Sequence, residues 1–287
     1  MRILNRIAML TICLAAGVSL CRAEDWQEIK GEHFIVRYLK ADASNAEGFA
    51  QDVAGKAETY YRRIAEDLGY PRYSEFWTWD NRVKIYLYPD QASYVRSGNH
   101  PQWSAGMADY EKKQIISFSG STRFSEHVLP HEIAHLIFRD FVGFTGEIPL
   151  WLDEGVAQWE EESLRPDIKR VSKLMFEKDS LLTLDDMMTL DVRTINPGSV
   201  YQRPTVTRSG QKAVIVLSGD ALVNHFYVEA SSLVGFFIER FGSLEFAKFC
   251  RQLRDGNSFE QAVQAVYSGL RSLADVEKEW KRYLEAG

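Results

Sequence analysis

The stretch His131-Glu132-Ile133-Ala134-His135 has the form H-E-x-x-H and lies in a run of apolar residues at helical spacing. Histidines four residues apart on a helix lie one above the other on the same face, so their imidazoles can converge on one ion. Glu132 is too close in sequence to His131 to share that ion easily, but it can reach a water molecule bound there. Pro130 places the histidines near the start of the helix or just after a kink.

A third ligand is needed before this pentapeptide indicates a metal site. Two helix-surface histidines beside a solvated glutamate would produce the same letters, whereas hydrolytic zinc sites usually have three protein ligands and leave the fourth position to water. Glu154 lies nineteen residues after His135, beyond a turn region with two glycines and a proline. A helix, a reversal and a second helix would bring Glu154 back beside the histidines. Asp153 is chemically competent as well, but the offset favours Glu154.

The chain before and around the motif predicts an α+β protein. Its 287 residues are 45% hydrophobic and 26% charged, which excludes disorder and a polytopic membrane protein and allows a large core without disulfides. Alternating apolar residues predict strands, and one stretch has helical spacing. We expect strands at 33–38, 83–88 and 114–118, a strand at 105–109 that forms a hairpin with the last of these, and a helix at 46–68. This order favours a small mixed sheet packed with the motif-bearing helix.

Helical runs after residue 226 predict a second, helical lobe. The runs are broken at 241–242, 255–257 and 268–269. Their phenylalanines and the thiol of Cys250 fall on apolar helix faces, so we expect them in the core of this lobe. Between the lobes, residues 190–222 contain only one strand-like run, at 213–217, and loops this long are often functional. The five phenylalanines are Phe236, Phe237, Phe241, Phe246 and Phe249.

The N-terminus has the features of a secretory signal. Arg2 and Arg6 precede an uncharged stretch over residues 7–20, and Ala23 precedes two acids, so we place cleavage after Ala23. The apolar run is shorter than the roughly 20 residues that span a bilayer, which argues against a stable membrane span. A lipoprotein that uses Cys21 is the alternative, disfavoured by the bulky Leu20 before it. The predicted division is a signal peptide (1–23), a motif-bearing lobe (24–162), a connecting helix with a long insert (163–225) and a helical lobe (226–287).

The mature chain is acidic. Cleavage removes three arginines and no acid, so the formal net charge changes from −6 to −9. Nucleic acid and anionic membrane surfaces are disfavoured as partners because both require a basic face. We expect an exported protein, periplasmic or secreted.

The motif and its surroundings resemble the gluzincin clan of zinc metallopeptidases, which includes thermolysin and the aminopeptidase N relatives. H-E-x-x-H, eighteen residues and a glutamate match the aminopeptidase N spacing. The segment 151–157 (WLDEGVA) is similar to W-L-x-E-G-x-A of small bacterial peptidase-MA-like domains. The resemblance implies a zincin-like catalytic lobe and a zinc-dependent peptidase that acts on peptides or proteins. Residues 106–109 (GMAD) depart from the G-x-M-E-N segment of the aminopeptidases and argue against that activity.

By resemblance, one catalytic Zn²⁺ would be held by His131, His135 and Glu154. Glu132 would be the general base that deprotonates the zinc-bound water and later protonates the leaving amine. Gln158, one turn after the glutamate ligand, stands where relatives often have a carboxylate that orients a zinc histidine. Its carbonyl would accept the imidazole proton, and a neutral amide would lower zinc affinity.

Relatives also supply a Tyr or His that stabilises the oxyanion, and residues 224–231 (NHFYVEAS) resemble the start of the helix that carries it. We expect Tyr227 in this role, with His225 as the second choice and ordinary helix packing as the alternative. The hairpin through 114–118 would offer its free edge to an extended peptide. The 190–222 segment would cover the cleft as a flap.

Other chemistry-bearing residues have plainer interpretations. We expect His127 to be exposed or to lie behind the ligands, and Trp77 and Trp79 to pack in a satellite core. The run Glu160-Glu161-Glu162 is expected to be a solvated helix end.

Two alternatives to the peptidase remain. The first is a non-catalytic zinc-containing protein that binds peptides or envelope partners, although the presence of Glu132 beside all three ligands argues against a decayed site. The second is structural zinc, disfavoured because closed structural sites use Cys and His with four protein ligands.

Overall fold

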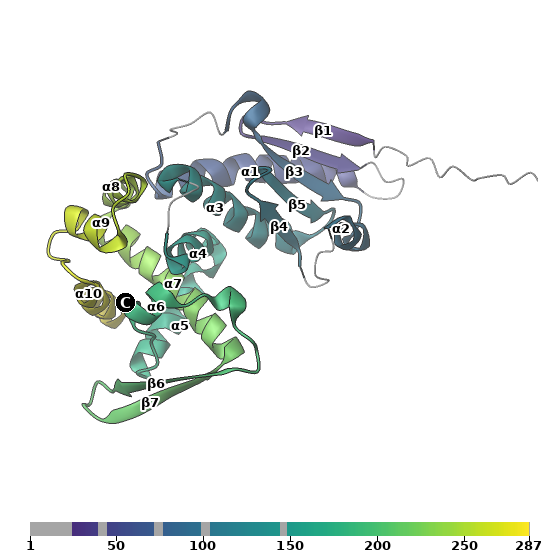
Figure 1. The fold of residues 1–287 in the computed structure, drawn as a ribbon. Coiled ribbons are helices and arrows are strands. Elements are labelled where there is room, and N and C mark those ends of the chain that lie inside the picture. Colours follow the sequence, from purple (N-terminus) through teal and green to yellow (C-terminus); the bar gives the residue numbers. More distant parts are fainter. Residues whose placement is uncertain (1–24, 40–44, 72–76, 99–103, 144–147, 287) are drawn as a thin grey trace, which may run out of the picture.

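A computed structural model describes residues 25–286 except 40–44, 72–76, 99–103 and 144–147 (Figure 1). The expected signal peptide, with Cys21, lies outside the described residues, as does the side chain of Trp79. The described chain is a mixed α+β protein with a small mixed sheet and a helical C-terminal region, as the sequence predicts.

The sheet has five strands in the order β1-β2-β3-β5-β4. β2 pairs with β3 and β3 with β5 in parallel, whereas β1 and β4 are antiparallel edge strands. Alternation decides which face is buried: in β3 the side chains of Val83, Ile85 and Leu87 are fully buried and those between them are half-buried. The first edge strand was not predicted. The strands are β1 (Trp26–Lys30), β2 (Phe34–Leu39), β3 (Val83–Tyr88), β4 (Gly106–Asp109) and β5 (Gln114–Phe118).

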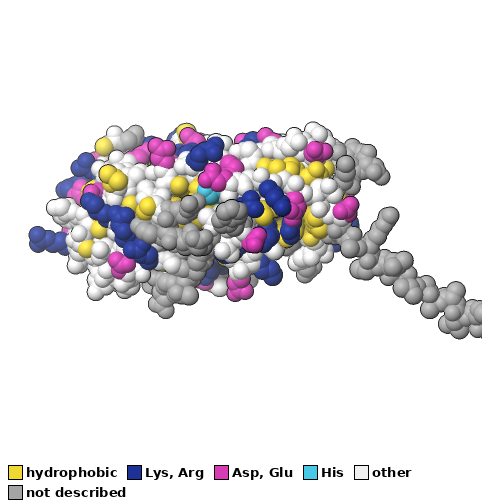
Figure 2. All heavy atoms as spheres, turned by 90° about the horizontal axis from the view of Figure 1, so that it is seen from above, with side chains coloured by type: hydrophobic (Ala, Val, Ile, Leu, Met, Phe, Trp, Pro, Cys, Tyr) yellow, Lys and Arg dark blue, Asp and Glu magenta, His cyan; other side chains and the backbone are white. Residues whose placement is uncertain are grey.

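Helices α1 (Ala46–Asp67) and α3 (Leu129–Val142) pack together beneath the sheet (Figure 1). α1 is the helix predicted at 46–68, and α3 carries the H-E-x-x-H motif. A short helix that was not predicted, α2 (Gln91–Gly98), lies beside β3 and β5. Trp77 is fully buried against α1, as expected, but it belongs to the main core and not to a satellite core. On the side of the molecule seen in Figure 2, acidic and basic side chains are interspersed among the described residues.

The helical region begins with α4, which follows α3. The predicted breaks are confirmed, since α7 ends at Phe241, α8 at Arg254 and α9 at Val266, but α7 starts at Gly219, earlier than expected. Four of the five phenylalanines and Cys250 are buried, Phe241 is partly buried, and burial raises the pKa of the Cys250 thiol. The helices are α4 (Leu150–Trp159), α5 (Arg165–Glu177), α6 (Leu184–Thr189), α7 (Gly219–Phe241), α8 (Ser243–Arg254), α9 (Phe259–Val266) and α10 (Leu273–Ala286).

α7 is long and apolar enough to cross a bilayer by length and composition. Most of its apolar window is buried inside the protein, as in the core helix of a globular domain, so the helix is weak evidence for a membrane span.

The insert between the lobes forms a two-stranded hairpin, β6 (Val200–Val206) and β7 (Lys212–Ser218). The expectation of one strand was wrong: β6 contains Pro204, which a two-stranded sheet tolerates because each strand has a free edge. The hairpin lies at the end of the helical region far from the sheet (Figure 1), and its side chains bond to residues 177–186. The hairpin is therefore not placed as a flap over the histidines, whereas Arg193, earlier in the predicted 190–222 flap, has an electrostatic interaction with Glu154.

α4 and α7 come unusually close together at two glycines. A Cβ on Gly155 of α4 would lie 2.5 Å from the carbonyl oxygen of Ala230, and one on Gly235 of α7 would lie 2.4 Å from the ring of Trp159. Real Cβ contacts are not this short, so glycine is needed at both positions. The close packing fixes α4, the helix that carries Glu154, against the core of the helical region.

Gly155→Ala should destabilise the protein by about 1–3 kcal/mol, because the added methyl group forces the helices apart. Gly55, on an exposed turn of α1, is the matched control, since no atom lies within 4 Å of the position of its Cβ. Gly55→Ala should stabilise by roughly 0.4–1 kcal/mol through helix propensity and chain entropy. Urea unfolding measures both changes, and shifts of the same sign would contradict the packing argument.

Candidate metal centre

The two histidines of the motif share one face of α3, near its start. Pro130 is the second residue of the helix and follows a π-helical turn, η3 (Phe124–Val128), so the predicted position near the helix start is confirmed. His131 is half-buried and His135 is buried. Their Nε2 atoms face each other at 3.2 Å, which leaves room for at most one proton between them.

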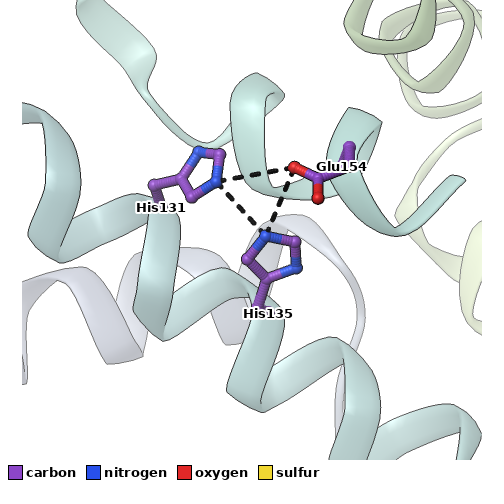
Figure 3. Close-up of side chains that lie close together, drawn as sticks. All are labelled: His131, His135 and Glu154. Carbon is purple, nitrogen blue, oxygen red and sulfur yellow. Dashed lines mark hydrogen bonds and ion pairs between the residues drawn. The ribbon is translucent and has the colours of Figure 1, made fainter. Parts of the chain in front are cut away.

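Glu154 on α4 completes a cluster with the two histidines (Figure 3). Its Oε2 lies 3.8 Å from Nε2 of His131 and 3.7 Å from Nε2 of His135. A point equidistant from three atoms with these separations lies about 2.1 Å from each, within the range of Zn–N and Zn–O bonds. The donor set of two imidazoles and one carboxylate fits zinc and other first-row divalent ions.

Each histidine has a carboxylate behind it. The Nδ1 atom of His131 lies 3.0 Å from Oε1 of Glu161, and Nδ1 of His135 lies 3.0 Å from Oδ1 of Asp153. An Nδ1–H that donates to a carboxylate leaves the lone pair of Nε2 directed at the cluster and makes the imidazole a better ligand. These contacts orient both rings for one ion.

Asp153 is itself held by Arg139, one turn after His135 on α3. Nε and Nη2 of Arg139 donate to Oδ2 of Asp153 at 3.0 and 2.6 Å. Burial raises the pKa of Asp153, but His135 and Arg139 lower it further, so the net shift is downward. Burial lowers the pKa of His135, whereas Asp153 and Glu154 raise it, and the result is a pKa of about 10. The site thus favours positive charge.

Two expectations about this region were wrong. In the run Glu160-Glu161-Glu162, expected to be solvated, the first two residues are buried and only Glu162 is exposed. Gln158 does not contact an imidazole in any described hydrogen bond; its Nε2 donates to Oε1 of Glu161 at 3.2 Å. The carboxylate of Glu161 therefore takes the role expected of the amide, and the argument for lowered zinc affinity no longer applies.

Tyr110, which sequence reasoning missed, reaches the site from the turn after β4. Its hydroxyl donates to Oε2 of Glu132 at 3.4 Å, and its ring lies 5.9 Å from that of His135. Desolvation of the phenol, in a residue that is 38% exposed as a whole, and the neighbouring carboxylate of Glu132 raise the pKa of Tyr110. The β4–β5 hairpin thus brings a hydroxyl to the expected general base.

Tyr227 and His225 both lie on α7, but their side chains have different surroundings. The side chain of Tyr227 is half-buried, and burial together with the charge of Glu154 raises its pKa to about 12. Nδ1 of His225 lies 2.9 Å from the carbonyl oxygen of Ala221, and burial lowers its pKa. Of the two, only Tyr227 has an electrostatic interaction with a cluster residue among the described side chains. His127 lies behind the ligands, with Nδ1 3.7 Å from Oε2 of Glu161.

A cavity of about 390 Å³ opens beside His131 and Glu132. It is bounded by the start of the edge strand β4, by η3 and by Glu161. Larger cavities of about 670, 660 and 630 Å³ lie among the described residues near the β6–β7 hairpin, α5 and α10, and none of them contains a cluster residue. The smaller cavity is the one placed beside this site, because His131, Glu132 and Glu161 line it.

A comparison of the chain with protein-family models finds no match. A comparison with curated proteins finds none either.

Glu161→Gln should weaken zinc binding about 10- to 100-fold, because the amide no longer orients His131 as a charged acceptor. Glu162→Gln is the matched control: Glu162 is the neighbouring glutamate, exposed and paired with Arg63 at 2.8 Å. Competition with a chromophoric chelator measures both affinities. Equal affinities for the two variants would mean that Glu161 does not support the ligand.

Proposed function

We propose that this protein is an exported, zinc-dependent peptidase with a zincin-like catalytic lobe that hydrolyses peptide bonds through water activated by Glu132. The observation that carries the proposal is the convergence of His131, His135 and Glu154, with a carboxylate behind each imidazole. Two nitrogen donors, one oxygen donor and an adjacent glutamate are the set that hydrolytic zinc sites use.

The residues of the site divide the chemistry among them. A zinc ion held by the three ligands would lower the pKa of a water molecule and polarise the scissile carbonyl group. Glu132, next to His131 on the first turns of α3, would accept a proton from the attacking water and pass it to the departing amine. The hydroxyl of Tyr110, 3.4 Å from Glu132, would hold the carboxylate toward the cavity.

An extended peptide fits the surroundings of the cluster. β4 is an edge strand of the sheet, and the cavity at its start is lined by His131 and Glu132. A substrate that pairs with β4 as an added strand would run past the cluster. The scissile bond would then lie between the edge strand and α3.

The test of the proposal is cleavage of a diverse peptide library by zinc-loaded residues 24–287. We expect cuts identified by mass spectrometry that disappear in Glu132→Gln and after chelation. The position of the cuts distinguishes internal from terminal cleavage. Zinc-loaded protein that makes no cuts, or cuts that survive in Glu132→Gln, would contradict the proposal and favour a binding role.

Tyr227 is the residue we propose for the oxyanion. Its phenol is half-buried near Glu154, and a pKa of about 12 keeps it protonated as a donor at neutral pH. Tyr227→Phe should lower kcat by about 10²- to 10³-fold, the usual effect of removing one such donor, and leave KM and zinc content nearly unchanged. Full turnover in Tyr227→Phe would reject this role, and His225→Gln would then be compared in the same assay.

A further inference from the structure

The β6–β7 hairpin carries an apolar outer face. Val200 and Val206 are 62% and 65% exposed, and Val214 and Val216 are each 58% exposed. The register pairs Pro204 with Val214 and pairs the other valines with Gln202, Lys212 and Ser218, so the valines and Pro204 share this face with three polar side chains. A cluster of exposed apolar side chains of this kind, rimmed by polar residues, is typical of an interaction site.

The inner face of the hairpin is already used. The Tyr201 hydroxyl donates to Asp186 at 2.9 Å, and Nη2 of Arg203 donates to the carbonyl oxygen of Leu181 at 2.8 Å. Ile215 is buried on the same side. The hairpin therefore lies against the body of the protein through one face, and its valine face is turned to solvent.

The charges at the two ends of the hairpin are of opposite sign. Arg208, near the turn, is bound to Asp179 and to the carbonyl oxygen of Glu177. Lys212 at the tip and Asp220 at the base are both exposed, and no ion pair to either is found within the described part of the chain. A partner for this face should therefore carry an acid opposite the tip and a base opposite the foot of the hairpin.

We propose that the valine face binds the valine face of a second copy of this chain, with the two hairpins antiparallel. The two-fold axis lies between the two hairpins, perpendicular to the strands at their midpoint. It places β7 of one copy over β7 of the other, and the tip of each hairpin over the base of the other. Lys212 then lies over Ser218 of the second copy, where its long side chain can reach Asp220 of that copy. The symmetry produces this ion pair twice. A parallel arrangement would bring the two Lys212 side chains together.

Two features favour a second copy over an anionic lipid surface. Arg203 and Arg208 are bound within the protein, which leaves Lys212 as the exposed cation of the strands, and the valine face has none of the Trp or Phe side chains typical of interfacial anchors. The hairpin face is also small. Two strands of seven residues cover on the order of a few hundred Å², below the roughly 800 Å² per partner of a standard interface, so the dimer should be weak.

Sedimentation velocity of residues 24–287 at about 5–500 µM tests the proposal. We expect reversible dimers that form at the upper end of this concentration range, because small interfaces are weak. Val214→Asp with Val216→Asp should raise the dissociation constant at least tenfold. Leu244→Asp is the matched control, since Leu244 is 76% exposed on α8, outside the hairpin, and should leave the constant unchanged.

A charge exchange tests the antiparallel arrangement. Lys212→Asp and Asp220→Lys should each weaken the dimer, and the double variant should restore it, because the pair is reformed with its signs exchanged. Thermal unfolding of each variant confirms that the fold is retained. A monomer at every concentration, a dimer indifferent to the valine substitutions, or a double variant no better than the single ones would overturn the proposal. Binding of the monomer to phosphatidylglycerol vesicles through the same valines would overturn it in favour of a lipid surface.

Discussion

The candidate metal centre depends on the close approach of α4 to α7. His131 and His135 come from one helix and are placed by its periodicity alone, but Glu154 comes from another helix that must be held at a fixed height beside them. Gly155, the next residue, lies directly against the backbone of α7 at Ala230, and Gly235 of α7 accepts the ring of Trp159 in return. Because glycine lacks a Cβ, the helices reach a separation that other residues would prevent. The third ligand is therefore positioned by the core of the helical region.

A second connection joins α4 to α3 through charge. Asp153 is buried between the imidazole of His135 and the guanidinium of Arg139, which lie one turn apart on α3. A buried carboxylate is tolerated only when it is paired and hydrogen-bonded. Asp153 on α4 finds both of its partners on α3, so its burial stabilises the packing of the two helices against each other. The same contact sets the tautomer of His135. Packing against α7 and pairing with α3 thus act on adjacent residues of α4 and determine the direction in which Glu154 points.

The sequence was sufficient to predict those features that depend on the pattern of a single helix or hairpin. The motif helix, the 105–118 hairpin, the breaks after α7, α8 and α9, and the buried phenylalanines all follow from periodicity and turn residues. The 19-residue offset also identified Glu154 ahead of Asp153. Prediction failed where a contact joined distant elements. Glu161 follows the end of α4, whereas the family resemblance pointed to Gln158, one turn after Glu154. A run of three glutamates also resembles solvent-exposed surface. Tyr110 reaches Glu132 across the sheet edge, a contact that no local pattern encodes.

The charge of the site argues for the kind of ion it would hold. Asp153, Glu154 and Glu161 surround two imidazoles, and Arg139 supplies one compensating positive charge. With neutral histidines, three carboxylates against one guanidinium leave two negative charges in a largely buried volume, which is costly unless cations neutralise them. The pKa of His135 is raised because Asp153 and Glu154 stabilise its protonated form. A proton on His135 neutralises only one of the two negative charges, and it occupies the nitrogen that faces Glu154. A divalent ion would neutralise both negative charges and would leave both imidazoles neutral, the form in which they act as ligands.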